Sequence, residues 1–340
     1  MAPDRSEEPR PESDPPAPER SPYRPDLPAP PAARREDEPA DTGSVSLASL
    51  TAVSPEAHGG PDAADRPAPS FVHADDLPPD RPSRFDALWA DRHYVGGIPF
   101  VARDPIGAAG DLVLAALAPG GGAHVHLANA YSVSLANRYP ALAAETFCAG
   151  GWNLPDGRPI AVLSRLRGDR PVLRQVRGPQ FMLDVCEQGV ASGLKHYLLG
   201  GSPEVLVALE RALREEFPGI DIAGSFSPPF REPTDLELAE RDAAVISSGA
   251  HVVWVGLGTP KQDREVARLA RSTGRVAVAV GAAFDFAAGT LREAPMWMRR
   301  LGLEWLFRLL MEPRRLWRRY LIGNVHFLGV VLRHGARPWL

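Results

Sequence analysis

Residues 253–263 constrain the fold of this chain more than any other segment. Their sequence, VWVGLGTPKQD, starts with apolar residues, passes through two glycines and a Thr-Pro break, and ends in a polar triplet typical of a helix start. The pattern predicts a buried parallel strand that ends in a glycine loop. Ligands of open α/β sheets bind at such strand ends, where glycines let a phosphate or sugar approach the backbone. An ordinary strand–turn–helix joint has the same pattern. The choice between a ligand-binding loop and a structural joint therefore depends on other segments of the sequence.

Strand-like and helix-like patterns alternate from about residue 85 onward. The predicted strands are residues 124–128, 160–164, 196–199, 220–223, 251–255 and 276–280. The predicted helices are one from residue 130 and residues 181–191, 204–217, 235–247 and 263–272. Ser202 and Thr234 are expected to cap the helices that follow them. Alternation with short joints predicts the α/β class, with a mostly parallel sheet covered by helices on both faces.

The N-terminal segment has a different composition. Residues 1–82 contain 19 of the 36 prolines and carry 17 acidic and 8 basic residues, a net charge of −9. Such a segment buries too little apolar area to offset chain entropy, so residues 1–84 are predicted to be a disordered, Pro-rich acidic tail. No apolar run typical of a signal peptide follows Met1. Cys148 and Cys186 have no metal or redox spacing and suit reduced thiols in a cytoplasmic protein.

The C-terminal segment is basic. Residues 292–340 contain 10 Arg, no Lys and 3 Glu, a net charge of +7 in a chain whose total is −4. Tryptophans and leucines recur there at near-helical spacing, and Pro313 is expected to divide the segment into two helices. The longest apolar run, residues 320–332, is too short to span a bilayer. Arginines beside aromatics suit an anionic membrane surface; a helix solvated on its arginine face explains the pattern equally well.

Four blocks of sequence resemble one known family in order and spacing. They are GLGTPKQ (residues 256–262), VGAAFDFAAG (280–289), APMWM (294–298) and GLEWLFR (302–308), the last followed by EPRR (312–315). With them, the chain is similar to the WecG/TagA/CpsF glycosyltransferases (glycosyltransferase family 26) over about residues 94–327. The resemblance implies a Rossmann-like domain, residues 85–291, followed by a basic amphipathic helical appendage, residues 292–340, that helps to dock the enzyme on the membrane.

The resemblance also implies an activity. Family members are inverting enzymes that need no metal, and none of the residues indicates a cofactor. They move a sugar, of hexose or N-acetylhexosamine type, from a nucleotide donor, usually UDP-linked, to an acceptor on a polyprenyl diphosphate in bacterial cell-surface polysaccharide synthesis. The expected partners are therefore the nucleotide sugar, the lipid-linked acceptor and an anionic membrane surface, with no nucleic acid; a homo-oligomer is left open. The expected location is cytoplasmic, peripheral on the inner face of the cell membrane.

The resemblance assigns two catalytic residues. Asp156, in WNLPDG (residues 152–157), matches the family's Asp-Gly pair and is expected to take the proton from the acceptor hydroxyl. An isolated Asp-Gly would be a surface turn. Asn129, in HLANA (126–130), matches a substrate-contacting Asn at a strand end. Many members have Thr two residues before it, where this chain has Leu127, so that contact is absent.

The remaining site residues follow in two groups. The expected substrate-binding residues are Gly157, Arg177, Gly200, Gly201, Gly258, Thr259, Lys261, Gln262, Asp285 and Arg308. The residues expected at the membrane or the lipid diphosphate are Trp305, Arg314, Arg315, Arg318 and Arg319. Lys261 offsets diphosphate charge or is a solvated helix-start lysine, and Asp285 binds the sugar or caps a turn.

Besides Leu127, this chain departs from the family pattern at three further positions. Gln175 stands where members often have the Arg of Arg-Val-x-Gly, so Arg177 or Arg174 is expected to supply that charge. Asp263 replaces a Glu, and Glu293 replaces the Arg before Ala-Pro. These changes bear on phosphate contacts and on the donor sugar, and leave the fold unaffected.

Two other classes of function were weighed against the transferase. A catalytically idle binding protein on the same fold is disfavoured because Asp156 and Asn129 are retained. A nicotinamide-dependent oxidoreductase expects Gly-x-Gly-x-x-Gly after the first strand, with an acidic residue about twenty positions later. The glycine run at residues 120–122 precedes a strand instead. The chain also has no Asp-x-Asp pair, in agreement with a metal-independent transferase.

Overall fold

The computed structural model describes residues 92–120 and 122–334, which all lie within one compact unit of the chain. The predicted tail, residues 1–84, is outside the described residues, and so are the side chains of Arg300 and Arg315. The proposed domain boundaries near residues 84 and 291 therefore stay predictions.

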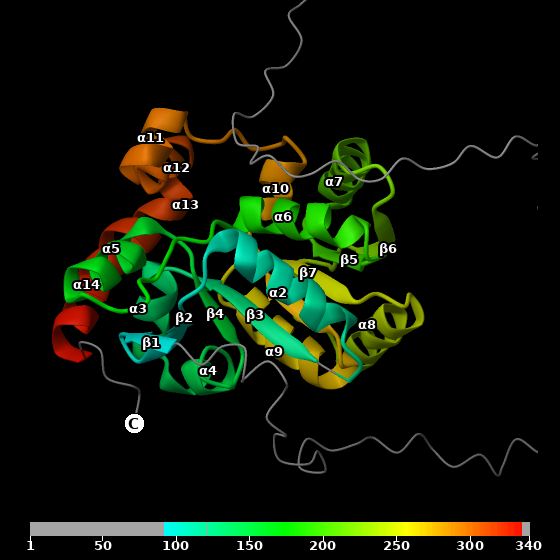
Figure 1. The fold of residues 1–340 in the computed structure, drawn as a ribbon, viewed down its shortest axis with the longest axis horizontal. Coiled ribbons are helices and arrows are strands. Elements are labelled where there is room, and N and C mark those ends of the chain that lie inside the picture. The colour runs from blue at the N-terminus through cyan, green and yellow to red at the C-terminus, as the bar shows by residue number, and fades with distance from the viewer. Residues whose placement is uncertain (1–91, 121, 335–340) are drawn as a thin grey trace, which may run out of the picture. The chain divides into compact units, whose positions relative to one another are not determined.

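A six-stranded parallel sheet runs through the described part of the chain, in the order β4-β3-β8-β7-β5-β6 (Figure 1). Its strands are β3 (Ala123–Ala128), β4 (Trp152–Pro155), β5 (Lys195–Gly200), β6 (Asp221–Phe226), β7 (Val252–Gly256) and β8 (Val276–Ala279). The two central strands, β7 and β8, are apolar because both of their faces are covered. The sheet confirms the predicted α/β class.

Helices cover both faces of the sheet. On one face lie α2 (Pro105–Leu117), α6 (Gly178–Val190), α7 (Pro203–Glu216) and α10 (Ala283–Ala287), packed around Trp254 and Phe181. On the other face, α8 (Asp235–Ser247) and α9 (Lys261–Thr273) pack on Val253, Val255 and Ala279. The predicted caps are confirmed: Ser202 accepts a hydrogen bond from the amide of Val205, and Thr234 forms a capping box with Glu237.

A third apolar cluster lies beside β3 and β4. It joins the hairpin β1 (Arg92–Val95) and β2 (Ile98–Val101) to α3 (Ala130–Arg138), α4 (Pro140–Glu145) and α14 (Gly323–His334). The sequence patterns did not predict the hairpin, α2 or α4. The predicted strand at residues 160–164 was wrong, because these residues lie in α5 (Arg158–Arg167). Only Ile160 and Ser164 of them are buried, four residues apart, as on one face of a helix.

The C-terminal segment forms a series of short helices. These are α11 (Met296–Leu301), α12 (Glu304–Met311), α13 (Pro313–Trp317), a π-helical turn (Arg318–Ile322) and α14. Pro313 separates α12 from α13 as predicted. Many large apolar side chains stay exposed on this segment, among them Trp297, Leu310 and Leu328. No helix in the described ranges combines the length and apolarity that a membrane crossing requires.

The order of the strands marks the edge where a ligand would bind. The chain passes from β3 to its neighbour β4, and then crosses to β5 on the far side of β3, β8 and β7. Strand order thus reverses next to β3, and open α/β sheets bind ligands at the carboxyl ends of strands at such a point. Asn129, Asp156 and Gly258 follow the carboxyl ends of β3, β4 and β7.

Candidate active site

A pocket of about 240 Å³ lies at this carboxyl edge. Two walls enclose it. The sheet wall consists of residues from the strand ends and the helix starts that follow them: Leu127, Asn129, Tyr131, Asp156, Gly157, Arg177, Gly258, Thr259, Gln262 and Gly281. The appendage wall consists of residues from α12 to α14 and the preceding turn: Gly302, Glu304, Trp305, Arg308, Arg319, Tyr320 and Asn324. Segments more than a hundred residues apart in sequence therefore build one site.

Asp156 is held at the floor of the pocket by the parallel pairing of β3 and β4. Pro155 pairs with Ala128, and the amide of Asp156 donates to the carbonyl of Ala128 at 2.8 Å. The next residue, Gly157, has φ of 99°, a conformation that L side chains rarely adopt. The Asp-Gly pair is therefore a sharp joint between β4 and α5, and Asp156 lines the pocket at this joint.

The environment of Asp156 suits a base that works near neutral pH. Burial and, next, the negative charge of Glu304 raise the pKa of Asp156 to about 6, against the opposing influence of Arg177, Arg319 and Arg308. A carboxyl group with a pKa near the working pH is poised to accept a proton and to release it again. Among the predicted site residues that the structure describes, Asp156 is the one whose pKa is moved toward neutral pH.

Asn129 has a structural role beside its place in the pocket. It caps α3: its Oδ1 accepts hydrogen bonds from the amides of Tyr131 at 3.0 Å and Ser132 at 3.3 Å. Ser132 returns a bond by accepting from the amide of Asn129. Oδ1 is thereby fixed toward α3, which leaves the side-chain NH₂ as the group of Asn129 that can donate to a ligand.

An ion pair joins the two walls. Arg177 precedes α6, and its Nη2 lies 2.5 Å from Oε1 of Glu304 on α12 and 3.7 Å from Oε1 of Glu293. Glu293 is also paired with Arg299. The charge that the sequence assigned to substrate binding at Arg177 is thus matched by two carboxylates. Sequence reasoning missed Glu304, although it lies in the GLEWLFR block that carried the resemblance.

Arg308 and Arg319 present unmatched charge to the pocket. The guanidinium of Arg308 lies over the ring of Phe286 at 5.6 Å, and that of Arg319 over the ring of Tyr131 at 4.9 Å. Both Nε atoms are buried, and within the described residues neither has a hydrogen-bond partner or a carboxylate at ion-pair distance. Buried donors without partners are costly, and an anion with several oxygens would satisfy them.

Gln262 connects two loops of the sheet wall. Its Oε1 accepts a hydrogen bond from the amide of Gly258 at 2.9 Å, and its side chain lies next to Gly281 after β8. Gly258, Thr259 and Gln262 line the pocket, and their expected contact with the donor stays a prediction. Within the described residues, no group of three or more His, Cys, Asp or Glu side chains is placed to hold a metal ion.

Several predicted site residues do not line this pocket. They are Gly200, Gly201, Lys261, Asp285, Arg314 and Arg318. A Cβ on Gly200 would lie 2.7 Å from the backbone of Gly256, so this glycine allows β5 and β7 to approach. Lys261 is exposed and pairs with Glu232 at 3.3 Å. The backbone carbonyl of Asp285 accepts from the hydroxyl of Thr290.

The basic residues of the appendage fall on two sides. Arg319 lines the pocket with Trp305, whereas Arg314 and Arg318 are exposed, the latter with its guanidinium 5.2 Å from the ring centroid of Trp317. The prediction for Arg315 concerns a side chain outside the described part of the structure. The arginines that the sequence grouped together are therefore divided between the pocket and the outer surface.

Comparison with known proteins agrees with this architecture. The family model described as "Glycosyl transferase WecG/TagA/CpsF family" matches residues 94–339, which include both walls. A relative from Bacillus spizizenii, an N-acetylglucosaminyldiphosphoundecaprenol N-acetyl-beta-D-mannosaminyltransferase, is 29% identical over 189 residues, 54% of this chain and 70% of the relative. The match to the family model covers most of the chain and every residue that lines the described pocket. The chain is therefore an enzyme that belongs to the WecG/TagA/CpsF family of glycosyl transferases.

Proposed function

We propose that this enzyme is an inverting, metal-independent transferase that moves a hexose or N-acetylhexosamine from a UDP-sugar to a sugar carried on polyprenyl diphosphate. The printed name of the Bacillus relative supports an undecaprenyl-diphosphate-linked acceptor that bears N-acetylglucosamine. The observation that carries the proposal is that Asp156, Arg308 and Arg319 line one pocket, with both arginines near enough to influence the pKa of Asp156. A base on one wall and two cations on the other suit a single displacement with an anionic leaving group.

In the proposed reaction, Asp156 accepts the proton of the acceptor hydroxyl as its oxygen attacks the anomeric carbon. The new C–O bond forms on the face opposite the bond that breaks, so the configuration inverts. The electron pair of the broken bond leaves with the nucleoside diphosphate. Preorganised cations stabilise charge that develops in the transition state, and we assign this role to Arg308 and Arg319. Asn129 donates from its NH₂ group, and Gln262 shapes the donor side.

We further propose that the enzyme works peripherally on the inner face of the cell membrane. Trp297, Leu310 and Leu328 are exposed on the same C-terminal segment as the exposed Arg314 and Arg318, which supports this location. Apolar side chains beside cations suit the headgroup region of an anionic bilayer. Such a surface would bring the pocket to a lipid-linked acceptor without a spanning helix.

The test is a transfer assay with a panel of nucleotide sugars and synthetic polyprenyl-diphosphate N-acetylglucosamine. We expect transfer from a UDP-sugar, with inverted configuration by NMR and full activity in the presence of a chelator. Transfer with retained configuration, or loss of activity with the chelator, would contradict the mechanism. Affinity for UDP alone, measured by calorimetry, tells whether Arg308 and Arg319 bind the leaving diphosphate or the diphosphate of the lipid.

A further inference from the structure

Three buried polar side chains next to the pocket form a chain that the proposed reaction does not use. His124 and His126 lie on β3, and Asp263 lies in the first turn of α9. Nδ1 of His124 is 2.9 Å from Nε2 of His126, and Nδ1 of His126 is 3.1 Å from Oδ1 of Asp263. Nε2 of His124 is 3.3 Å from the carbonyl oxygen of Ala149. All three side chains are more than nine-tenths buried.

The position of the protons in this chain follows from its partners. A carbonyl oxygen only accepts, so Nε2 of His124 carries a proton. Burial and the neighbouring His126 lower the pKa of His124 to about 3, so its ring is neutral and its Nδ1 is an acceptor. Nε2 of His126 therefore carries the proton of the second bond. The third bond holds one more proton between His126 and Asp263. The three side chains together therefore carry no net charge.

These hydrogen bonds hold the N-terminal turn of α9, which contributes Gln262 to the pocket. Asp263 follows Gln262, whose side chain accepts from the amide of Gly258 and lies beside Gly281. The same turn of helix thus contacts β3 through Asp263, the loop after β7 through Gly258, and the loop after β8 through Gly281. A shift of this turn would move the donor side of the pocket.

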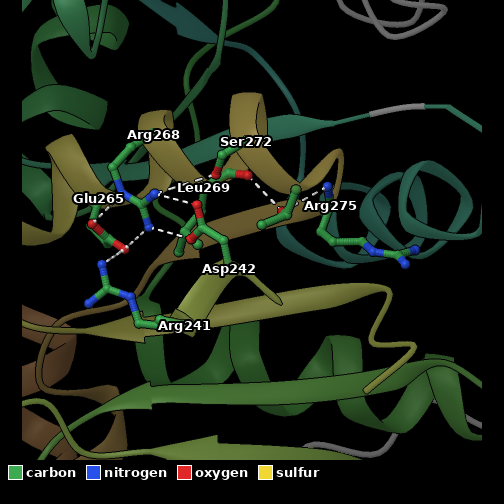
Figure 2. Close-up of polar contacts among 8 residues, drawn as sticks. Arg241, Asp242, Glu265, Arg268, Leu269, Ser272 and Arg275 are labelled. Carbon is green, nitrogen blue, oxygen red and sulfur yellow. Dashed lines mark hydrogen bonds and ion pairs between the residues drawn. The ribbon is translucent and has the colours of Figure 1, made fainter. Parts of the chain in front are cut away.

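The middle of α9 is held separately. Figure 2 shows Arg268 of α9 between Asp242 of α8 and Glu265, with Arg241 completing the group. Arg268 makes paired bonds to both carboxylates, between 2.6 and 3.1 Å. This network joins two helices on the outer side of the sheet and includes no residue that lines the pocket. It serves as the matched comparison for the buried chain on β3.

We propose that His124, His126 and Asp263 form a net-neutral hydrogen-bonded relay that positions Gln262 and the Gly258 loop for the nucleotide diphosphate. Asp263 is a positioning residue, since it acts through Gln262. Asp263 contributes through its hydrogen bond with Nδ1 of His126, and not through its charge or its shape. The link to the nucleotide rests on the function proposed above, whereas the relay itself rests on the hydrogen-bond distances and on the neutral ring of His124.

Two substitutions separate these contributions. Asp263→Asn supplies an NH₂ group that donates to Nδ1 of His126, and so keeps every bond of the neutral chain. Asp263→Leu has nearly the same volume but leaves that nitrogen buried and unpaired. Asp242→Leu is the control, because it breaks the outer network of α9 and leaves the relay intact.

The first measurement is amide hydrogen exchange of the full-length protein without ligand, over residues 256–263. We expect at least tenfold faster exchange in Asp263→Leu, and rates close to wild type in Asp263→Asn and Asp242→Leu. Equal exchange in the Leu and Asn variants would overturn the proposal. If both variants exchange equally fast, the charge of Asp263 is essential, and if both match wild type, its hydrogen bond is dispensable.

The second measurement is ¹⁵N NMR of the histidine rings in the wild-type protein, which needs no variant to fold. The relay predicts protonated Nε2 on both His124 and His126; a proton on Nδ1 of His124 would overturn it. The third is UDP affinity, which we expect to fall about tenfold in Asp263→Leu and to recover in Asp263→Asn. Faster exchange with unchanged UDP affinity would support the relay and contradict the donor site proposed above.

Discussion

The two walls of the pocket are built by different means. The sheet wall rests on paired strands and a buried core, and Asp156 and Gln262 are fixed there by backbone hydrogen bonds. The four segments from α11 through the π-helical turn bury only Met298 and Leu316 among their described apolar side chains. The appendage wall meets the sheet side through the ion pairs of Arg177, through Arg308 over Phe286 and Arg319 over Tyr131, and through the packing of α14 on α3. The comparison sets a side anchored in the core, which we propose performs the proton transfer, against a side held mainly by ion pairs and ring contacts, which we propose supplies positive charge.

The strongest test of this division is Asp156→Asn on the sheet wall. We expect transfer to fall by roughly a hundredfold or more, the scale of a lost general base. UDP affinity should change little, because the arginines of the appendage wall remain. The measurement is kcat in the lipid acceptor assay together with UDP calorimetry. Near wild-type turnover would assign the base elsewhere.

The complementary test on the appendage wall is Arg308→Gln and Arg319→Gln. Each removes a charged donor to the diphosphate, an interaction of about 1.5–3 kcal/mol, so UDP affinity should fall roughly tenfold to hundredfold. Arg→Lys should recover only part of the loss, because a point charge lacks the two-pronged geometry. Exposed Arg333→Gln is the control. Unchanged affinity in both variants would remove these arginines from the donor site.

The outer face of the appendage should matter for membrane binding alone. Arg314→Gln with Arg318→Gln should weaken binding to anionic vesicles, by roughly fivefold for each charge, since a basic residue near the surface contributes about 1 kcal/mol. Residual binding should also depend less on salt. Activity on a short soluble acceptor should be unaffected. Equal sedimentation of variant and wild type with vesicles at low salt would return these arginines to a solvated surface.

The ion pair between the walls should tune the base. Because Asp156 must be ionised to accept a proton, kcat/KM should rise with pH through about 6. Glu304→Gln removes a negative charge that raises this pKa and frees the positive charge of Arg177, and both effects act in the same direction. The rise should therefore move to lower pH. A shift to higher pH, or none, would show that Glu304 does not influence Asp156.

The smallest expected effect concerns stability. The pKa of Asp156 is higher in the folded protein than its ordinary value near 3.8, so ionisation destabilises the fold. The penalty is absent well below pH 4, grows between pH 4 and 6, and is complete above pH 7. Asp156→Asn should therefore be more stable than wild type at pH 8, with an advantage that shrinks toward pH 4. Thermal melting at several pH values measures this, and a constant difference would contradict it.

The sheet wall was largely predictable and the appendage wall was not. Strands such as residues 276–279 have an unmistakable apolar pattern, and caps such as Thr234 obey local rules. Asp156 required the family resemblance, because an Asp-Gly pair alone suggests a turn. The division of Arg319 from Arg318 depends on how the π-helical turn is oriented against Tyr131, which spacing does not reveal. The predicted strand at residues 160–164 was wrong for a related reason, because a short apolar run suits a strand or a helix equally.

The appendage wall comes from one continuous stretch, residues 302–324, whereas the sheet wall gathers residues from five separate parts of the chain. A single exchange of sequence could therefore replace Arg308 and Arg319, the cations that we propose bind phosphate, at once, while a new sheet wall would require coordinated change throughout the core. In evolutionary terms, the C-terminal stretch is a module. Descendants of one ancestral enzyme could acquire new lipid carriers by altering it and still inherit the same proton-transfer chemistry.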